Sequence, residues 1–335
     1  MKRILLLQTG GTIAMQIRRD ADGRLNNLPS DSLEKYIPEL SAIADIECLD
    51  LFFKDSSDMN PNDWVTLARA IESNYDAYDG FVVLHGTDTM AYTASALSFC
   101  FKNLTKPVIF TGSQLPLSVI RSDAGRNLIN AVQMATLPFC EVAICFSDKI
   151  LRGNRSTKVS IGDFTAFTSP NHPALAEIGI DIHVKHALRP SGNAMECYPA
   201  FSEELMVLQL FPGIKPARYI PLLAEQTRAV IISGYGSGNF PSSGDYSLIP
   251  FLEACMERNI FMVMASQAVF DAVDLEKYSS GRIARELGVI SSGDMTIEAA
   301  VTKMMYLLAR YSSPYQIRDA YVRVLRGEMT PVHTS

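Results

Sequence analysis

Residues 81–90 read FVVLHGTDTM, an apolar run that stops at His85 and continues into two hydroxyl side chains and a carboxylate. The run is typical of a buried strand in a parallel sheet. Ligands of open α/β sheets bind beyond the carboxyl ends of the strands, which is where Thr87 and Asp88 stand. These residues could instead only cap the next helix, with Gly86 permitting the turn. For one such cluster alone, capping is the simpler interpretation.

Similar polar clusters follow four other apolar runs of the chain. Glycine lets a backbone approach a small ligand closely, and hydroxyls and amides can then face that ligand. Several hydroxyl-rich strand ends would converge on one edge of a parallel sheet, and this coincidence favours catalysis. The clusters are TGGTIAM (9–15), KDSSDMN (54–60), TGSQ (111–114) and DKILRGNRSTK (148–158).

The residue types disfavour several familiar chemistries. TGGTI lacks the lysine of a GxxxxGK[ST] phosphate loop and the third glycine of GxGxxG. His85 is the only histidine near the clusters, and the chain has no Gly-x-Ser-x-Gly motif, so a Ser-His-Asp triad is poorly supported. No grouping of histidine, cysteine and carboxylate residues indicates a metal site, and we expect neither a metal nor a cofactor.

What remains is a set of hydroxyls with one lysine and one carboxylate. A threonine hydroxyl can act as a nucleophile if a neighbour accepts its proton. A lysine can be that acceptor if desolvation lowers its pKa, with a carboxylate orienting it. Thr87, Lys158 and Asp88 would then form a relay comparable with a Ser-His-Asp triad. The candidates are Thr12, Ser56, Ser57, Thr87, Asp88 and Lys158.

Strand-length apolar runs alternate with amphipathic stretches, and these elements must position the candidates. The alternation predicts an α/β fold: a larger N-terminal three-layer domain with a parallel sheet over 1–184, an irregular linker over 185–205, and a smaller C-terminal α/β domain over 206–335. The expected strands are 3–8, 50–53, 81–85, 107–112, 142–147, 206–211, 229–235 and 260–266, and the expected helices are 62–75, 93–101, 122–135, 217–226, 247–259 and 296–311.

Composition places the chain among ordinary globular proteins, with 335 residues, 47% hydrophobic and 20% charged. A net charge of −6 and the lack of a basic stripe argue against nucleic-acid partners. No run approaches the roughly 18 apolar residues of a membrane span, and the apolar run that follows Met1-Lys2-Arg3 is too short for a signal peptide. We therefore expect a cytoplasmic protein without a membrane partner.

Taken together, the motifs resemble those of the L-asparaginase family, most closely its cytoplasmic bacterial type I branch. TGGTI alone is a moderate signal, but with HGTDT at this spacing it is highly specific. The resemblance extends over nearly the whole chain. The motifs are TGGTI (9–13), DSSDM (55–59), HGTDTMAYTASALS (85–98), TGSQLPL (111–117), RGNRSTK (152–158), FTSPN (167–171), GYGSGNFP (234–241) and SSGDMTIEAAVTK (291–303).

The resemblance implies hydrolysis of L-asparagine to L-aspartate and ammonia through an acyl-enzyme, without a cofactor. Thr12 would attack the side-chain amide, and Thr87, Lys158 and Asp88 would activate water, although either threonine can be argued to lead. Asp88 would also bind the substrate ammonium, and Ser56 the α-carboxylate. The flanking Asp55 and Ser57 would lie close by, and main-chain N–H groups at Gly11 and Thr87 would face the oxyanion.

The chain departs from the family pattern after TGGTI. Many members carry a tyrosine there, but residues 13–31 contain none, and Leu25 stands about where one is expected. Our hypothesis is that Tyr278 in EKYSSGR replaces it as the partner of Thr12, with ordinary packing as the alternative. Residues 13–31 would form a lid over the substrate or a plain connection.

The family also implies an assembly, in which Asn239 of one subunit could reach the site of another in a homodimer or a dimer of dimers. Three alternatives to an asparaginase remain: a glutamine-preferring enzyme, an ammonia-supplying subunit of tRNA-dependent amidation, and a binding protein without turnover. The second would be expected to carry an extra N-terminal domain, whereas here TGGTI begins at residue 9. The third has no need of two threonines and a paired lysine.

Overall fold

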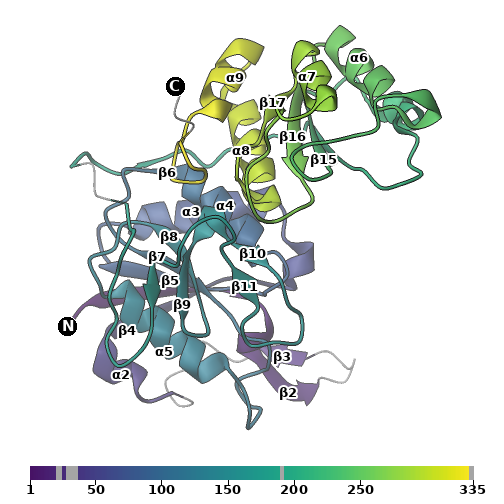
Figure 1. Ribbon diagram of the computed structural model, residues 1–335. Helices are drawn as coiled ribbons and strands as arrows, with labels where there is room; N and C mark the ends of the chain where they lie inside the picture. Colours follow the sequence, from purple (N-terminus) through teal and green to yellow (C-terminus); the bar gives the residue numbers. More distant parts are fainter. Residues whose placement is uncertain (20–24, 28–36, 189–191, 332–335) are drawn as a thin grey trace. The chain divides into compact units, whose positions relative to one another are not determined.

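The computed structural model describes residues 1–19, 25–27, 37–188 and 192–331 (Figure 1). The chain divides into two units, Met1–Pro199 and Ala200–Ser335, and each contains its own parallel-strand sheet. The predicted class, two α/β domains with the larger one first, is confirmed. The division lies inside the segment 185–205, which remains our proposed linker between domains over 1–184 and 206–335.

Seven strands form the main sheet of the first unit in the order β12-β9-β8-β7-β5-β1-β4. The five strands from β8 to β4 are parallel neighbours, whereas β9 and β12 join antiparallel beyond β8. The carboxyl ends of the parallel neighbours β4, β1 and β5 therefore lie side by side at one edge of the sheet. The bounds are β1 Arg3–Gly10, β4 Asp45–Lys54, β5 Gly80–Leu84, β7 Val108–Thr111, β8 Val142–Phe146, β9 Lys149–Arg152 and β12 Ala176–Glu177.

Three strands of this sheet differ from the sequence prediction: β4, β9, and β12, whose two residues lie where no strand was expected. β4 begins at Asp45 rather than near residue 50, because it is an edge strand whose exposed polar residues interrupt the apolar run. β9 occupies part of the segment 148–158, where we expected only a polar connection. Its sequence, KILR, has only two adjacent apolar residues between two cations, so it gives neither an apolar run nor a period-2 alternation.

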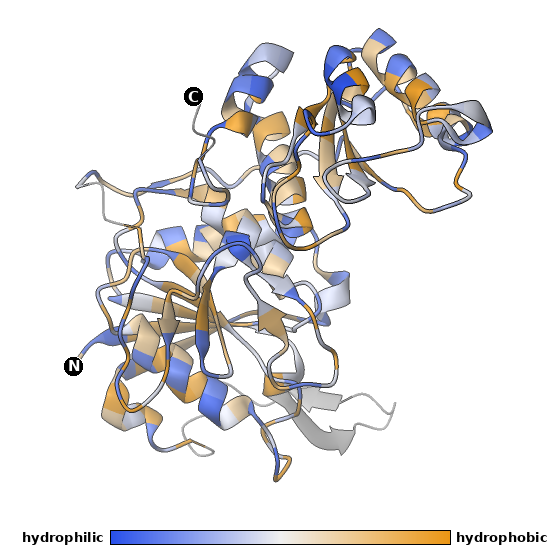
Figure 2. Cartoon of the chain, viewed as in Figure 1, coloured by the Kyte–Doolittle hydropathy of each residue, from blue (hydrophilic) through white to orange (hydrophobic). Residues whose placement is uncertain are grey.

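Helices cover both faces of the main sheet, as a three-layer fold requires (Figure 1). α3 (Pro61–Asn74) and α4 (Met90–Cys100) lie on one face, and α2 (Leu40–Ile43) and α5 (Ala124–Ala135) on the other. Figure 2 shows hydrophobic residues concentrated on the strands and on the helix surfaces that meet them. One core cluster joins Leu6 of β1 and Val82 of β5 to Leu128 of α5. This burial fixes the strand ends that carry the polar clusters.

The second unit has a parallel four-stranded sheet in the order β14-β15-β16-β17. We expected a helix over 217–226, but this segment forms the 3₁₀ helix η5 (Pro216–Leu222) and an irregular continuation. Pro221 has no N–H for an α-helical hydrogen bond, which explains the difference. The other bounds are β14 Leu205–Gln209, β15 Ala229–Gly234, β16 Phe261–Ser266, β17 Ile290–Ser291, α6 Ile249–Glu257, α7 Ser279–Glu286, α8 Ile297–Arg310 and α9 Pro314–Val322.

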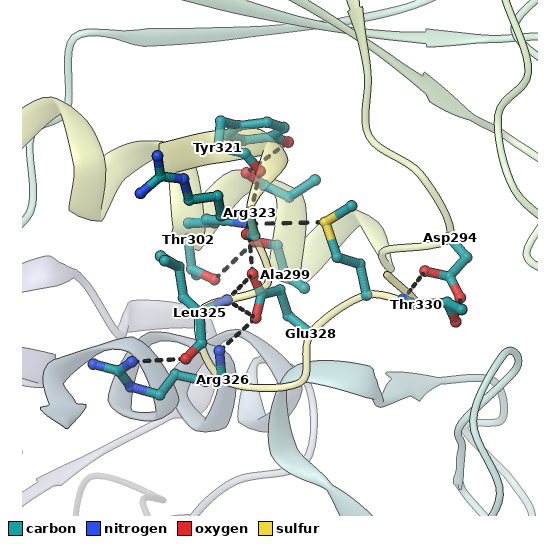
Figure 3. A network of polar contacts seen from close by, with 12 residues as sticks. Asp294, Ala299, Thr302, Tyr321, Arg323, Leu325, Arg326, Glu328 and Thr330 are labelled. Atoms are coloured by element: carbon teal, nitrogen blue, oxygen red, sulfur yellow. Dashed lines mark hydrogen bonds and ion pairs between the residues drawn. The ribbon is translucent and has the colours of Figure 1, made fainter. Parts of the chain in front are cut away.

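A buried ion pair ties the C-terminal segment to α8 (Figure 3). The ammonium of Lys303 is fully buried, donates to the carbonyls of Tyr321 and Arg323 at 2.7 and 2.6 Å, and pairs with the fully buried carboxylate of Glu328. Glu328 also accepts from the backbone N–H of Leu325 and of Arg326. Every charge in this network therefore has several partners.

Short elements complete the fold. They are η1 (Thr12–Ala14), η3 (Ser56–Asp58), η4 (Gly153–Arg155), η6 (Gly244–Tyr246), and the antiparallel pairs β2 (Met15–Arg19) with β3 (Leu25–Asn27), β6 (Phe101–Lys102) with β13 (Glu196–Cys197), and β10 (Thr157–Lys158) with β11 (Phe167–Thr168). The predicted lid over 13–31 includes β2, β3 and Leu25, while residues 20–24 and 28–31 lie outside the described residues. In the described part, no helix has the length and apolar character that crossing a membrane requires.

Candidate active site

The polar clusters after β1, β4 and β5 meet at one edge, because these three strands are neighbours in the sheet. Gly10 at the end of β1 pairs with Lys54 at the end of β4, and Gln8 pairs with Leu84 at the end of β5. Thr9 Oγ1 also donates to the Leu84 carbonyl at 2.8 Å. The convergence predicted from the sequence is therefore found for these three clusters.

Two glycines let the threonine-bearing loops touch. Gly11 has φ +88°, and a Cβ on it would lie 2.4 Å from the Gly86 nitrogen, well inside any real contact. Only glycine fits there. Since Thr12 follows Gly11 and Thr87 follows Gly86, this backbone contact places the two candidate nucleophiles on neighbouring loops.

Lys158 joins Thr87 and Asp88 in one polar group. Its Nζ donates to Thr87 Oγ1 at 2.8 Å and forms an ion pair with Asp88 Oδ1 at 2.6 Å. The lysine side chain is only 16% exposed, whereas that of Asp88 is 62% exposed. Backbone pairing of Lys158 with Phe167 across β10 and β11 holds the lysine in this position. A largely shielded ammonium thus lies between a hydroxyl and a carboxylate that remains accessible to a cationic ligand.

The DSSD segment is bound directly to the HGTDT segment. Ser56 is buried; its Oγ accepts from the Asp88 N–H at 3.2 Å, and its carbonyl accepts from Thr89 Oγ1 at 2.6 Å. Asp55 caps η3 by accepting from the backbone N–H and the hydroxyl of Ser57 at 2.9 and 2.8 Å. These two hydrogen bonds lower the pKa of the Asp55 carboxyl. Asp55 and Ser57 therefore shape the turn that presents Ser56.

His85 is a buried residue of this site for which the sequence suggested no role. Its pKa is lowered to about 4, mainly because burial disfavours the charged ring. Nδ1 lies 2.7 Å from the Gly86 carbonyl oxygen, and Nε2 lies 2.9 Å from Thr93 Oγ1. The indole of Trp64 donates to the same hydroxyl at 3.2 Å. The only sequence signal was the position of His85 directly before the Gly-Thr-Asp turn.

The TGSQ cluster after β7 has a structural use. Ser113 is buried and donates to the Leu115 carbonyl at 2.7 Å, and the Gln114 N–H donates to the Asp123 carboxylate at 3.1 Å. The Gln114 amide also donates to the Asp163 carbonyl at 3.0 Å. This cluster therefore braces the loops around Lys158 through loop-to-loop hydrogen bonds.

Tyr278 and Asn239 belong to the second unit. Tyr278 precedes α7 and is 47% exposed. Asn239 follows β15 and forms a bridge with Tyr235, and its Oδ1 accepts from Ser280 Oγ in α7 at 3.2 Å. The Asn239 turn is thus tied to the helix that starts after Tyr278. Among the described residues, no group of three or more histidine, cysteine or acidic side chains could hold a metal ion.

Known proteins resemble this chain over almost its full length. The family model "Asparaginase, N-terminal" matches residues 3–190, and "Glutaminase/Asparaginase C-terminal domain" matches residues 204–321. L-asparaginase 1 of Escherichia coli (strain K12) is 40% identical over 339 residues, which cover 98% of each chain. The structure of the thermostable L-asparaginase from Thermococcus kodakarensis is 37% identical with a TM-score of 0.90, covering 98% of this chain and 99% of that one.

A third similar protein is the probable cytoplasmic L-asparaginase from Campylobacter jejuni, whose structure is 26% identical with a TM-score of 0.81 and covers 97% of this chain and 100% of that one. Both family models lie on the two units in the expected order. The sequence motifs, the fold and these similarities agree, and the chain belongs to the asparaginase family, in its type I branch.

Proposed function

We propose that this protein hydrolyses L-asparagine to L-aspartate and ammonia. The observation that carries the proposal is the Thr87–Lys158–Asp88 group, which lies beside the Gly11–Gly86 contact in a chain of the asparaginase family. The group combines a hydroxyl, a largely shielded ammonium and an accessible carboxylate. A protein that only binds asparagine would gain nothing from a lysine held against a threonine.

Substrate binding follows from the charges at the edge. Asp88 is accessible and would attract the α-ammonium, while Ser56 would donate its hydroxyl proton to the α-carboxylate. Ser56 Oγ can accept from the Asp88 N–H and donate to the substrate at the same time, because it accepts through a lone pair and its own proton stays available. Asp55 and Ser57 hold the turn that carries Ser56. Fixing both ends of the zwitterion places the side-chain amide near its attack geometry.

The reaction is a two-step acyl transfer. Thr12 Oγ1 attacks the amide carbon, the C–N bond breaks, and the nitrogen leaves as ammonia with the threonine proton. Water then attacks the ester, and the C–O bond to Thr12 breaks to release aspartate. We assign water activation to Thr87, Lys158 and Asp88, and oxyanion binding to the backbone N–H groups at Gly11 and Thr87.

Two residues of the second unit complete the proposal. Tyr278 would accept the proton of Thr12 in place of the missing loop tyrosine. Asn239 would reach the site of a neighbouring subunit in a homodimer or a dimer of dimers. Exposure of Tyr278 and anchoring of Asn239 to α7 support these roles. We also propose that the protein is cytoplasmic, like the Campylobacter relative.

The test is ammonia release from L-asparagine and, separately, L-glutamine, from micromolar to about ten-millimolar substrate. Thr12→Ala and Thr87→Val should each lower kcat on asparagine about 10³-fold or more. Lys158→Met should lower it about 10²-fold or more. Lys102→Met is the control, because Lys102 also forms an ion pair, with Glu196, but at an exposed site; its kcat should match the wild type.

Tyr278→Phe should lower kcat about tenfold or more, since the acceptor for the Thr12 proton is lost. Tyr315→Phe is its control, because Tyr315 is 78% exposed at the start of α9. Unchanged turnover in Tyr278→Phe would contradict the role of that residue alone. Wild-type protein that binds asparagine without releasing ammonia would contradict the proposed function, and a higher kcat/KM for glutamine would replace it with a glutaminase.

A further inference from the structure

A hydrogen-bonded series links the only tryptophan of the chain to the Gly86–Thr87 peptide. Because a carbonyl oxygen can only accept, the proton between Gly86 and His85 must sit on Nδ1. In the neutral ring Nε2 is then an acceptor, and the Thr93 hydroxyl donates to it. The same hydroxyl oxygen accepts from Trp64 Nε1. Every polar atom of this buried series thus has a partner of the right kind.

The bond from His85 fixes the orientation of one peptide plane. In a trans peptide, the C=O of one residue and the N–H of the next point in opposite directions. The Gly86 carbonyl is directed at the His85 ring, which is 1% exposed, so the Thr87 N–H must point away from the interior. Thr87 itself is only partly buried and contacts Lys158. The backbone of Gly11 packs against the Gly86 backbone, so closely that a Cβ on Gly11 would have no room.

We propose that His85 is a positioning residue for the hydrolysis: it holds the Gly86–Thr87 peptide so that the Thr87 N–H faces the oxygen of the tetrahedral intermediate. This inference rests on the proposed asparaginase function and adds a residue to it. His85 does not touch the substrate and exchanges no proton with it. Its contribution is to keep a backbone donor aimed at developing charge, which removal of a comparable donor elsewhere shows to be worth about 10²–10³-fold in kcat.

Two amide substitutions separate the two ring nitrogens. In His85→Asn, the amide nitrogen takes the place of Nδ1 and can still donate to the Gly86 carbonyl. In His85→Gln, the amide reaches the place of Nε2 and Thr93, but it leaves the Gly86 carbonyl without a donor. We expect His85→Gln to lower kcat about 10–100-fold with little change in KM, and His85→Asn to recover most of that loss. Fluorescence emission of Trp64 during urea unfolding compares the stability of the two variants.

A second readout isolates the oxyanion donor from any general loosening of the site. The hydroxyl of Thr12 can add across the aldehyde C=O of L-aspartate β-semialdehyde: a C–O bond to threonine forms, the C=O π bond opens, and the threonine proton passes to the former carbonyl oxygen. The hemiacetal has a tetrahedral carbon whose oxygen stands where the intermediate carries its charge, whereas the product L-aspartate forms no such adduct. His85→Gln should weaken binding of the semialdehyde about 10–100-fold and leave the Kd of L-aspartate nearly unchanged. Equal losses for both ligands, or equal kcat in the two variants, would overturn the proposal.

The tautomer can be measured in the wild-type protein and without turnover. In nitrogen NMR of histidine-labelled wild-type protein, the His85 ring, assigned by its absence from His85→Asn, should be protonated at Nδ1, unprotonated at Nε2 and shifted when the semialdehyde binds; His172, whose Nδ1 lies 2.8 Å from the Pro173 carbonyl, should show the same tautomer without that shift. A His85 ring protonated at Nε2 instead would overturn the proposal. Wild-type protein that shows the expected ring but releases no ammonia from asparagine would contradict the proposed function and not the arrangement at His85.

Discussion

The contact between Gly11 and Gly86 sets how closely the two candidate threonines approach. Both glycines precede a threonine in the chain, and their backbones are in direct contact. A Cβ on Gly11 would meet backbone atoms of Gly86 at 2.4 and 2.6 Å, and backbone cannot move aside as a flexible side chain can. At the residue scale, the absence of one side chain is therefore as important to the site as the hydroxyls themselves.

We predict that Gly11→Ala lowers kcat about 100-fold or more, because the new methyl group forces the Thr12 loop away from Thr87. Gly288→Ala is a matched control: Gly288 has φ +91° beside +88° for Gly11, but a Cβ there meets nothing within 4 Å. Both variants bear the left-handed backbone strain of about 1–2 kcal/mol, seen in urea unfolding. Comparable kcat in the two variants would show that the clash between a Cβ at position 11 and the Gly86 backbone does not affect catalysis.

At the scale of elements, a short antiparallel pair carries the lysine to the site. Lys158 is about 70 residues from Thr87, and neither β10 nor β11 is longer than two residues. Phe167 lies opposite Lys158 in this pair. The ring of Phe167 packs edge-on against that of Phe146, with 5.1 Å between the ring centroids. Phe146 belongs to β8, so this ring contact anchors the short β10–β11 pair to the main sheet.

In the second unit, the C-terminal segment depends on the pair formed by Lys303 and Glu328. Burial lowers the pKa of Lys303, and the nearby carboxylate of Glu328 opposes that shift. Two main-chain carbonyls and two main-chain N–H groups complete the network (Figure 3). Breaking such a pair leaves an uncompensated buried charge, which costs more than the intact pair contributes.

We predict that Glu328→Gln destabilises the protein by about 3–5 kcal/mol in urea unfolding, because the ammonium of Lys303 stays buried without its counter-charge. Glu204→Gln, which breaks the half-exposed pair with Arg228, should cost at most about 1 kcal/mol. Lys303→Met combined with Glu328→Leu should recover much of the loss. A cost for Glu328→Gln as small as that of the control would mean that the ion pair does not hold the segment.

At the scale of the whole molecule, the stability depends on pH through His85. The ring is 1% exposed, so it gains a proton freely only when the fold opens. Its folded-state pKa of about 4 lies below the ordinary value of 6.5, because burial outweighs its bond to Gly86 and the charge of Asp63. Stability from this group is therefore fully present above about pH 6.5 and is lost as pH falls toward 4.

We predict that the wild type loses about 3 kcal/mol more than His85→Asn between about pH 7 and about pH 4, since asparagine does not titrate. The measurement is the free energy of unfolding in urea at a series of pH values for both proteins. Carboxylates and the other histidines titrate equally in both, so they cancel in the difference. Parallel curves would show that His85 takes up a proton in the folded state as easily as in the unfolded chain.

The sequence determined by itself the fold class, the main strands and helices of both units, and the polar clusters at the strand ends, but not the short elements α2, β12, α7, β17 and α9. Hydrophobic runs of strand length and helical periodicity are local, so they can be recognised in a single chain. The same pattern failed where local signals are weak or misleading: at the exposed β4, at the four residues of β9, and at η5, where Pro221 prevents an α-helix. Residue type at the strand ends, and not periodicity, singled out Thr12 and Lys158, and the motif resemblance then assigned them roles in one reaction.

Only the tertiary structure decided which clusters touch. Sheet order places β1 between β4 and β5, and this brings Gly11, Ser56 and Gly86 together, whereas TGSQ became a brace between loops. It also revealed that His85, dismissed as a triad base, is a neutral ring tied to the Gly86 carbonyl. The physical reason is that contacts between distant residues depend on strand pairing and packing, which no short stretch of the chain encodes.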